Sequence, residues 1–498
     1  MLNRHRGTWG LNDDVRGRLE ATEVLALCGV LLALAALNLP ELGSDPWPLR
    51  PDTVDPVGPL APLVEAAGRR WDTGIARASA FLAALLAALA ALAGWRSGLT
   101  ARAAATLVVA VAVLLLAPAT LLQVGLRQAT APWFHTNDST YQIELAGELV
   151  LDGRSPYGHN YRFSGLERFY TRDGTASSAV REREVALRHY AYLPASALTA
   201  APWRLLPAPF DDYRLLVLVA TLASGLVMLL FAAPLAMRLA AAAVVAANPI
   251  AVRSAWFGQN DAPSILFLLL AFALYTRQRY RLAAASLAVA VLLKQFAAVA
   301  LPFLAVMLVQ RPLGRAELSR VAATFAGVLL AGVLPFAAAD PVAFYEDTVE
   351  FGAGTYRIVG YGLSAILVRL GVVADREGAY PFLALALLIW LPLTAWLLRQ
   401  QWRCREPWLG AAAFSISLLV LLFIGRTFNN YYLLWPMMGA LTAALLAASE
   451  RGEGRWSESS AGAPGSQLGT RREEHLAAAR ADPAQARATH MRAHRGNR

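Results

Sequence analysis

The segment from Ala103 to Leu126 reads AAATLVVAVAVLLLAPATLLQVGL and contains no charged residue. An α-helix needs roughly 20 consecutive apolar residues to cross a bilayer, so this segment is long enough to do so. Nine more apolar stretches occur, near residues 21–39, 77–94, 213–237, 239–251, 262–276, 318–338, 379–399, 408–424 and 431–449. Their runs of Ala, Leu and Val lack the alternation of barrel strands, and the sequence therefore predicts an all-α bundle of membrane helices.

The composition also indicates a membrane protein. Of the 498 residues, 57% are hydrophobic and only 16% are charged, whereas roughly a quarter of the residues of a soluble domain are charged. The formal net charge is +10, but many of the basic residues lie in short loops between apolar stretches. Such loops mark the cytoplasmic side of a membrane protein, so the charge gives no reason to expect a nucleic-acid partner.

Four basic loops set the expected orientation, because all of them can face the cytoplasm together: residues 96–102, 277–281, 311–320 and 401–405. Segments 40–76, 127–189, 248–261, 339–378 and 425–430 then lie on the other side. Functional side chains concentrate in loops. We therefore expect a multi-pass protein of the cell membrane with an extracytoplasmic active site, to which the longest outer segment, 127–189, contributes.

Two segments differ from simple crossings. Residues 190–207 contain three prolines and are not expected to cross fully. Residues 282–309 are too long for one crossing and favour a pair of short helices with Lys294 at the outer apex. With these segments we expect 11–13 transmembrane or partly inserted helices. The predicted parts are an N-terminal extension with two transmembrane helices (1–100), a main membrane domain (101–450) and a disordered cytoplasmic tail (451–498).

Lys294 is the only lysine in the chain, and it lies inside an apolar segment. A compact ammonium group at such a position is suited to binding a phosphate or a carboxylate. The alternative is a lysine that extends from a helix end toward the membrane surface. Lys294 is far from the basic loops on either side, which favours the functional interpretation.

Asp138 begins a predicted amphipathic helix that runs to about Asp152 at the membrane surface. Its spacing from Tyr141 and Gln142 places these side chains on one helix face, while the two glutamates of the helix face elsewhere. A carboxylate in this position could act as a general base. Asn137 or Asp138 could equally cap the helix, and the local pattern leaves both interpretations open.

The outer loop 248–261 ends in the polar run Gly258-Gln259-Asn260-Asp261. Side chains of this kind could orient the hydroxyl groups of a sugar. The alternative is a helix cap formed by Asn260 or Asp261, with Pro263 in the first turn of the next helix. The two interpretations are compatible, because one residue can serve both purposes.

Two further outer segments concentrate polar and aromatic residues. They contain Arg357 and Arg426, and arginine on the outer side favours an anionic ligand such as a phosphate. Asn430 and Tyr431 follow Arg426 closely, and the tyrosines there could equally form an interfacial aromatic belt.

Several of these motifs occur in an order that resembles the C-type membrane glycosyltransferases, and most closely the polyprenyl-phosphate-dependent mannosyltransferases of glycosyltransferase family 87. The resemblance covers residues 127–448. It rests on Asp138, Tyr141, Ala146, Leu149 and Gly153-Arg154-Ser155-Pro156-Tyr157, then on Asn248-Pro249, Gly258-Gln259, Lys294 and Asn430-Tyr431-Tyr432-Leu433-Leu434. The chain departs from the family pattern at Lys294-Gln295-Phe296 and at Tyr192-Leu193-Pro194, and it adds the extension 1–100.

The resemblance implies that a hexose, with mannose as the first expectation, passes from a polyprenyl-phosphate donor to an extracytoplasmic lipid or glycan acceptor with inversion. Asp138 would be the general base. Lys294, Arg357 and Arg426 would bind the donor phosphate. The residues expected at the sugar or acceptor are Tyr141, Gln259, Asn260, Asn430 and Tyr431. No Gly-rich phosphate loop indicates a nucleotide donor, no cofactor is implied with certainty, and a divalent metal is compatible with the pattern.

A membrane transporter or flippase for a lipid-linked sugar is the alternative. Lys294 and Asp138 would then be charges along a translocation path. Transporters are often built from repeats with paired broken helices. The sequence shows one candidate broken helix without a partner in the other half, and this favours an enzyme.

Overall fold

The computed structural model describes residues 18–42, 55–67, 74–129, 136–170, 187–355 and 358–461. Contacts group residues 1–447 in one compact unit and residues 448–498 in a second. The described part of the first unit is almost entirely helical, with one parallel pair of two-residue strands, β1 (Val359–Gly360) and β2 (Thr427–Phe428). The prediction of an all-α membrane bundle is confirmed.

Within the described residues, seven helices are long and apolar enough to cross a membrane. They are α1 (Ala21–Glu41), α3 (Gly74–Ser97), α4 (Ala101–Ala129), α14 (Arg315–Ala339), the run α17, η5 and α18 (Phe382–Cys404), α19 (Pro407–Ile424) and the apolar part of η6 and α20 (Asn430–Ser449). One bent pair, α9 (Leu235–Ala247) with α10 (Pro249–Phe257), also qualifies. Four shorter apolar helices are α8 (Tyr213–Met228), α11 (Ala262–Thr276), α12 (Tyr280–Leu293) and η3 with α13 (Gln295–Val309). Together these segments fall within the predicted range of 11–13.

The remaining elements are short or continue a span. They are α2 (Ala61–Ala66), α5 (Asp138–Leu151), η2 (Leu166–Tyr170), α7 (Pro194–Trp203), α15 (Pro341–Tyr345), η4 (Glu346–Thr355) and α16 (Leu363–Arg369). Within the long runs, α17 is Phe382–Leu385, η5 Ala386–Trp390, α18 Leu391–Cys404, η3 Gln295–Ala300, α13 Leu301–Val309 and η6 Asn430–Leu433. Helix α20 (Leu434–Ala461) continues past residue 451 into the predicted tail, and residues 462–498 lie outside the described residues.

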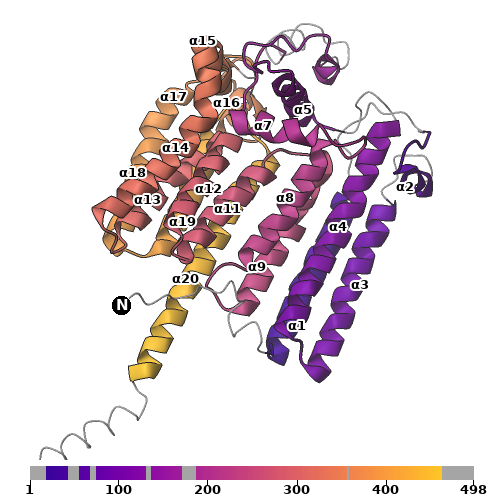
Figure 1. Cartoon of the computed structure of the whole chain (residues 1–498), viewed down its shortest axis with the longest axis vertical. Helices are drawn as coiled ribbons and strands as arrows, with labels where there is room; N and C mark the ends of the chain where they lie inside the picture. The colour runs from indigo at the N-terminus through magenta and orange to yellow at the C-terminus, as the bar shows by residue number, and fades with distance from the viewer. Residues whose placement is uncertain are drawn as a thin grey trace, which may run out of the picture. The chain divides into compact units, whose positions relative to one another are not determined.

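Helices α5 and α7 pack together across one end of the bundle, which we call the site end (Figure 1). Helix α7 has only 10 residues, about half the length that a crossing needs. Residues 190–207 therefore form a short helix on α5 and do not cross, as the prolines suggested. The predicted helix from Asp138 is also present, since α5 ends at Leu151 with Asp152 as its C-cap.

The segment 282–309 is broken at Lys294. Its backbone is extended there, with φ −155° and ψ 127°, between the end of α12 and the start of η3. Gln295 Nε2 donates to the Ala191 carbonyl at 2.8 Å, which places the break at the site end. The Tyr275 hydroxyl donates to the Met307 carbonyl at 3.2 Å, joining the far ends of α11 and α13. The expected pair of short helices with Lys294 between them is present.

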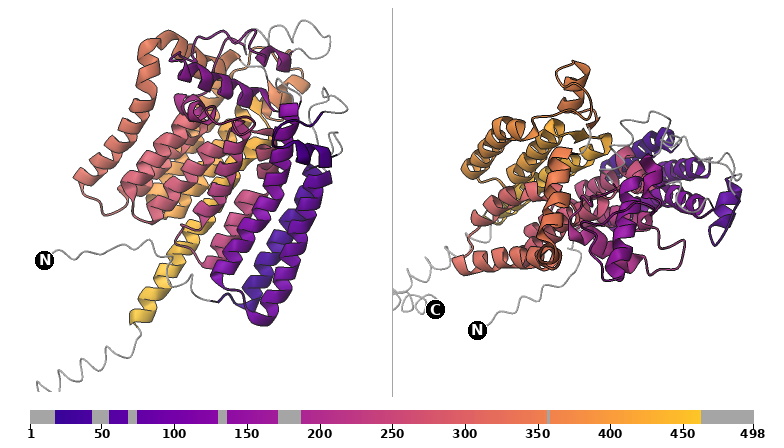
Figure 2. Two further views of the ribbon diagram at one scale, coloured as in Figure 1. Left: turned by 45° about the vertical axis from the view of Figure 1, so that its right-hand side comes forward. Right: turned by 90° about the horizontal axis from the view of Figure 1, so that it is seen from above.

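Helices α1, α3 and α4 lie side by side, and α1 also packs on α9 and α10 (Figure 2). They are rich in small residues, and one alanine row of α3 is completely or almost completely buried: Ala76, Ala80, Ala83 and Ala87. Small side chains let membrane helices approach closely. The extension therefore lies against the helix pair that leads into the loop 258–261.

Candidate functional site

Asn137, and not Asp138, caps helix α5. The Asn137 Oδ1 atom accepts a hydrogen bond from the Thr140 amide at 2.8 Å. Asp138 is the first helical residue and is partly exposed. Its carboxylate accepts from the Ser139 amide at 2.8 Å. The cap that the local pattern left open is thus supplied by the neighbouring residue.

The beginning of α5 is fastened to the end of α10. Asn137 Nδ2 donates to the Phe257 carbonyl at 2.8 Å, and the Thr140 hydroxyl donates to the Gly258 carbonyl. Gly258 ends α10 with φ +73°, and an added Cβ would lie 2.3 Å from Cγ of Arg214. Only glycine fits this left-handed, crowded position. Asp138 therefore lies beside the loop 258–261.

Lys294 is 7% exposed and has two partners in that loop. Its Nζ donates to Asn260 Oδ1 at 2.9 Å and lies 2.8 Å from Asp261 Oδ1. Asp261 also accepts a hydrogen bond from Trp435 Nε1 at 2.8 Å. A buried lysine with an acidic partner is not a lysine that extends toward the membrane surface. The sequence analysis placed Asp261 in a polar run suited to a sugar and at a possible helix cap, but it missed the pairing of Asp261 with Lys294.

Asp261 is the N-cap residue of α11, which begins at Ala262, but its side chain makes no capping hydrogen bond. Asn260 Nδ2 and Asp261 Oδ2 are buried and have no hydrogen-bond partner among the described residues. Leaving a buried polar atom unpaired costs about 1–3 kcal/mol. Two such atoms on adjacent residues are consistent with a site that a polar ligand completes.

Aromatic rings surround the Lys294 ammonium group. Its Nζ lies 6.0 Å from the ring centre of Tyr192, 5.4 Å from that of Phe296 and 5.7 Å from that of Tyr432. Rings at these distances attract a cation and exclude water from it. The enclosure strengthens any interaction between Lys294 and an anion.

Tyr192 connects Lys294 with Asp138. Its hydroxyl interacts with the side chains of Ser139 and Asn260 and with the charge of Asp138. Burial raises the pKa of Tyr192, and the Asp138 carboxylate raises it further, so the hydroxyl stays protonated at neutral pH. The Tyr431 side chain also interacts electrostatically with Asp138 and Asp261. Its hydroxyl accepts a hydrogen bond from Asn429 Nδ2 at 3.2 Å. We call Asp138, Tyr192, Asn260, Asp261, Lys294 and Tyr431 the site cluster.

Four predicted site residues make other contacts. The Tyr141 hydroxyl donates to the Ser164 carbonyl at 2.8 Å, so its side chain fastens the segment after α5. Gln259 accepts from the Ser254 hydroxyl at 2.9 Å. Asn430 is exposed and accepts from the Tyr431 amide at 2.9 Å.

Arg426, the fourth, is buried at the start of the β1–β2 pairing, where it donates to the Gly378 carbonyl at 3.3 Å. Arg357 lies outside the described residues. The structure thus brings together Asp138, Asn260, Lys294 and Tyr431 from the predicted set.

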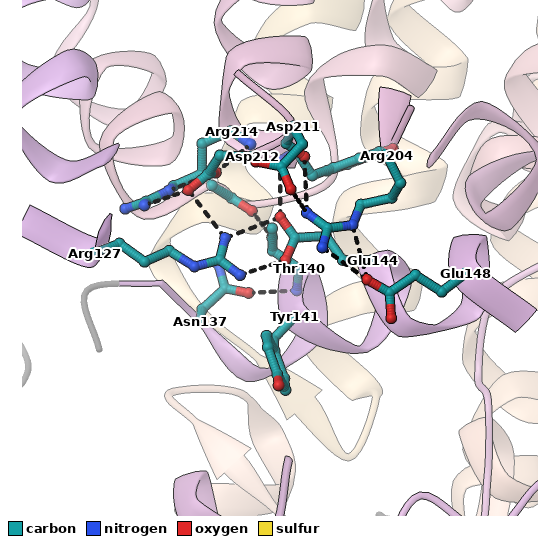
Figure 3. Close-up of polar contacts among 12 residues, drawn as sticks. Arg127, Asn137, Thr140, Tyr141, Glu144, Glu148, Arg204, Asp211, Asp212 and Arg214 are labelled. Carbon is teal, nitrogen blue, oxygen red and sulfur yellow. Dashed lines mark hydrogen bonds and ion pairs between the residues drawn. The ribbon is translucent and has the colours of Figure 1, made fainter. Parts of the chain in front are cut away.

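A cluster of ion pairs, shown in Figure 3, holds α5 from its other face. Arg127 at the end of α4 pairs with Glu144 of α5 at 2.6 Å and with Asp212 at 2.9 Å. Arg214 of α8 pairs with the same Asp212 carboxylate at 2.6 Å. Arg204 adds a more exposed pair with Glu148 at 2.7 Å. The sequence predicted that Glu144 and Glu148 face away from Asp138. It gave no signal for the ion-pair cluster that they join, because members of this cluster such as Arg127 and Asp212 are 85 residues apart.

The charge of Asp212 makes a testable contribution to stability. Burial alone would raise its pKa, but Arg214 and Arg127 outweigh burial and hold the pKa well below its usual range. A lowered folded pKa stabilises the fold above the unfolded value of about 4, and the stabilisation is lost as the pH falls below it. We expect Asp212→Asn to cost about 3–5 kcal/mol at pH 7 and to flatten the acid side of a thermal-melting profile.

Asp211→Asn is the matched control, because its carboxylate is 21% exposed and, among the residues that the structure describes, pairs only with Arg204 at the cluster's edge. It should leave the pH profile near that of the wild type. Equal acid sensitivity of the wild type and Asp212→Asn would show that other carboxylates control acid unfolding.

A comparison with protein families gives a match to part of the chain. Residues 190–425 match the model of glycosyltransferase family 87. No curated protein and no solved structure matches the chain. The matched range contains Tyr192, Asn260, Asp261 and Lys294 of the site cluster, whereas Asp138 precedes it. This match, on a bundle of membrane helices, shows that the chain contains a region of glycosyltransferase family 87 and identifies the protein as a membrane glycosyltransferase.

Proposed function

We propose that the protein transfers a hexose, mannose in the first instance, from a polyprenyl-phosphate donor to a lipid or glycan acceptor on the extracytoplasmic side of the cell membrane. The observation that carries the proposal is the site cluster. In it, Tyr192 and Asn260 connect a partly exposed carboxylate, Asp138, to a buried ammonium group, Lys294. These are the two charges that a one-step transfer from a phosphate requires.

Asp138 would accept the proton of the acceptor hydroxyl while that oxygen attacks the anomeric carbon. The bond between the anomeric carbon and the phosphate oxygen breaks in the same step, and its electrons leave with the lipid phosphate. Attack from the face opposite the leaving group inverts the configuration. Lys294 would stabilise the charge that grows on the departing phosphate, where electrostatic stabilisation is most effective.

Asp261 and Asn260 would keep Lys294 in place for this task. An ammonium group has three hydrogen-bond donors, and two of them point to Asn260 and Asp261. The third would donate to a phosphate oxygen. Asn260 Nδ2, which is buried and unpaired among the described residues, is a candidate for binding a sugar hydroxyl or a phosphate oxygen.

The other predicted ligands would line the outer part of the site. Asn430 and Tyr431 belong to η6, which leads directly into α20. Arg426 lies just before strand β2, at the start of the β1–β2 pairing. We keep Arg426 and Arg357 as proposed ligands of the donor phosphate. Gln259 and Tyr141 would support the walls of the site through their own hydrogen bonds.

The proposed side of the membrane rests on the basic loops. Loops 277–281 and 311–320 join α11 to α12 and α13 to α14, at the end of the bundle away from Lys294. The positive-inside rule places such loops in the cytoplasm. The site cluster would then face the extracytoplasmic side.

A divalent metal has no assigned place in this mechanism. The described residues contain no group of three or more His, Cys, Asp or Glu side chains arranged to hold one. Transfer should therefore be measured with and without a chelator, as part of the same experiment.

Transfer of labelled sugar in membranes that contain the full chain tests the proposal. The donors are polyprenyl-phosphate mannose, glucose and galactose, with GDP-mannose as a nucleotide-sugar control. We expect transfer from at least one lipid-linked donor, an inverted linkage in the product and none from GDP-mannose in washed membranes. Transfer from the nucleotide sugar alone would contradict the proposed donor class.

A further inference from the structure

The end of α1 meets the break between α9 and α10. These two helices bend by 42° at Asn248-Pro249. Pro249 has no amide hydrogen to donate to the turn before it. The Asn248 side chain instead caps α10 by accepting from the Ala251 amide at 2.9 Å.

This cap leaves the Ala247 carbonyl without its helical donor. In an uninterrupted helix the Ala251 amide would donate to Ala247, but here it donates to the Asn248 side chain. Asn38 of α1 supplies the missing donor, since its Nδ2 donates to the Ala247 carbonyl. A residue of the extension thus completes the hydrogen bonding of the helix break.

Asn38 is a costly residue at this position. It is completely buried, and its Oδ1 has no hydrogen-bond partner within the described part of the chain. An apolar side chain would avoid that penalty. The Nδ2 donor, shared between the Leu34 and Ala247 carbonyls, is the interaction that only the amide provides.

A second contact joins α1 to α10, three residues after Asn38 on α1 and six residues after Ala247. Arg253 Nη1 of α10 lies 3.3 Å from Glu41 Oε2 at the end of α1. The Arg253 guanidinium also lies over the Phe257 ring, with Cζ 5.6 Å from its centre. Glu41 therefore acts on the last turn of α10 through Arg253.

The last turn of α10 is where the site cluster is assembled. The Phe257 and Gly258 carbonyls anchor the start of α5, which carries Asp138. Two and three residues after Gly258, Asn260 and Asp261 hold Lys294. A change in the direction of α10 would move both the proposed base and the partners of the proposed phosphate ligand.

We propose that α1 is a positioning element of the active site, and that Asn38 and Glu41 are positioning residues that hold α10 and the loop 258–261 in the catalytic arrangement. The proposal gives the N-terminal extension a role in transfer, although it lies outside the family match at 190–425. Its catalytic part rests on the proposed function of the site cluster. Its structural part can be measured separately.

The first measurement is hydrogen–deuterium exchange of the peptides that cover residues 249–261, in the full chain in nanodiscs. The variants are Glu41→Arg, Asn38→Leu and the charge swap Glu41→Arg with Arg253→Glu. Glu41 is partly exposed, with 35% of its side chain accessible, so Glu41→Arg should fold even if Asn38→Leu does not. We expect exchange in these peptides to rise about fivefold in Glu41→Arg, as for loss of a partly exposed ion pair, and to return toward wild type in the charge swap.

The second measurement is kcat and acceptor KM for the same proteins at equal amounts of folded enzyme. A shifted site lowers the rate of the chemical step more than it weakens binding. We expect kcat to fall about tenfold in Glu41→Arg, with KM within about twofold, and the charge swap to restore most of it. Leu27→Ala is the control, because it removes a buried side chain of α1 far from the break and should lower thermal stability without changing kcat.

The two measurements separate the possible failures. Unchanged exchange in both Glu41→Arg and Asn38→Leu would overturn the hold of α1 on α10. Faster exchange with unchanged kcat would overturn the positioning role. A wild type without transfer from any lipid-linked donor would contradict the proposed function, while exchange would still decide whether α1 holds α10.

Discussion

Replacing Asp138 by asparagine is expected to lower kcat by about 10²–10⁴-fold, the usual contribution of a general base. The asparagine side chain has nearly the same shape but cannot accept the proton of the acceptor hydroxyl. Helix α5 should persist, because Asn137 provides its cap and the ion pairs of Arg127 hold its other face. The measurement is single-turnover transfer of labelled sugar, which reports the chemical step without product release.

Two controls make the result specific. Asp152→Asn changes the exposed C-cap residue of the same helix and should leave transfer near the wild-type rate. Thermal melting of Asp138→Asn should stay close to the wild type, because the asparagine side-chain oxygen can still accept the hydrogen bond from the Ser139 amide. Full transfer by Asp138→Asn would move the base elsewhere and remove the main assignment of the site cluster.

Local sequence patterns predicted the features that local physics controls. The charge-free run before Leu126 predicted a membrane helix because crossing length and composition decide that outcome. The Asn137-Asp138 pair predicted the start of α5, and Asp152-Gly153 its end, because capping depends on neighbouring residues. The break at Lys294 followed from an apolar segment too long for one crossing between two basic loops.

Contacts between distant segments could not be predicted in the same way. Asp261 fits a cap pattern before Pro263, and only the approach of α12 and α20 directs its carboxylate to Lys294 and Trp435. Tyr141 was placed with Asp138 by helical spacing, yet the chain after α5 returns and offers the Ser164 carbonyl to its hydroxyl. The contact of Asn38 with Ala247 spans 209 residues and leaves no local signature.

Replacing Lys294 by methionine is expected to lower transfer by about 10²–10³-fold, as for loss of one charge-stabilising donor in a closed site. This single change cannot separate two causes. It removes the proposed phosphate ligand, and it leaves Asp261, which is 1% exposed, without its counter-charge. Removing one partner of a buried ion pair destabilises a fold by about 3–5 kcal/mol.

Combining Lys294→Met with Asp261→Asn separates these causes. The double variant has no buried unpaired charge, and an asparagine oxygen at position 261 can still accept from Trp435 Nε1. We expect its melting temperature to return to within a few degrees of the wild type while transfer stays as low as in Lys294→Met. Asp261→Asn alone keeps the ammonium group and should retain measurable transfer.

If the double variant recovers transfer along with stability, Lys294 serves only to neutralise Asp261. The phosphate must then be bound by other residues, and Arg426 is the first to test. If the double variant is stable but transfer stays low, the charge that Lys294 stabilises is that of the departing phosphate.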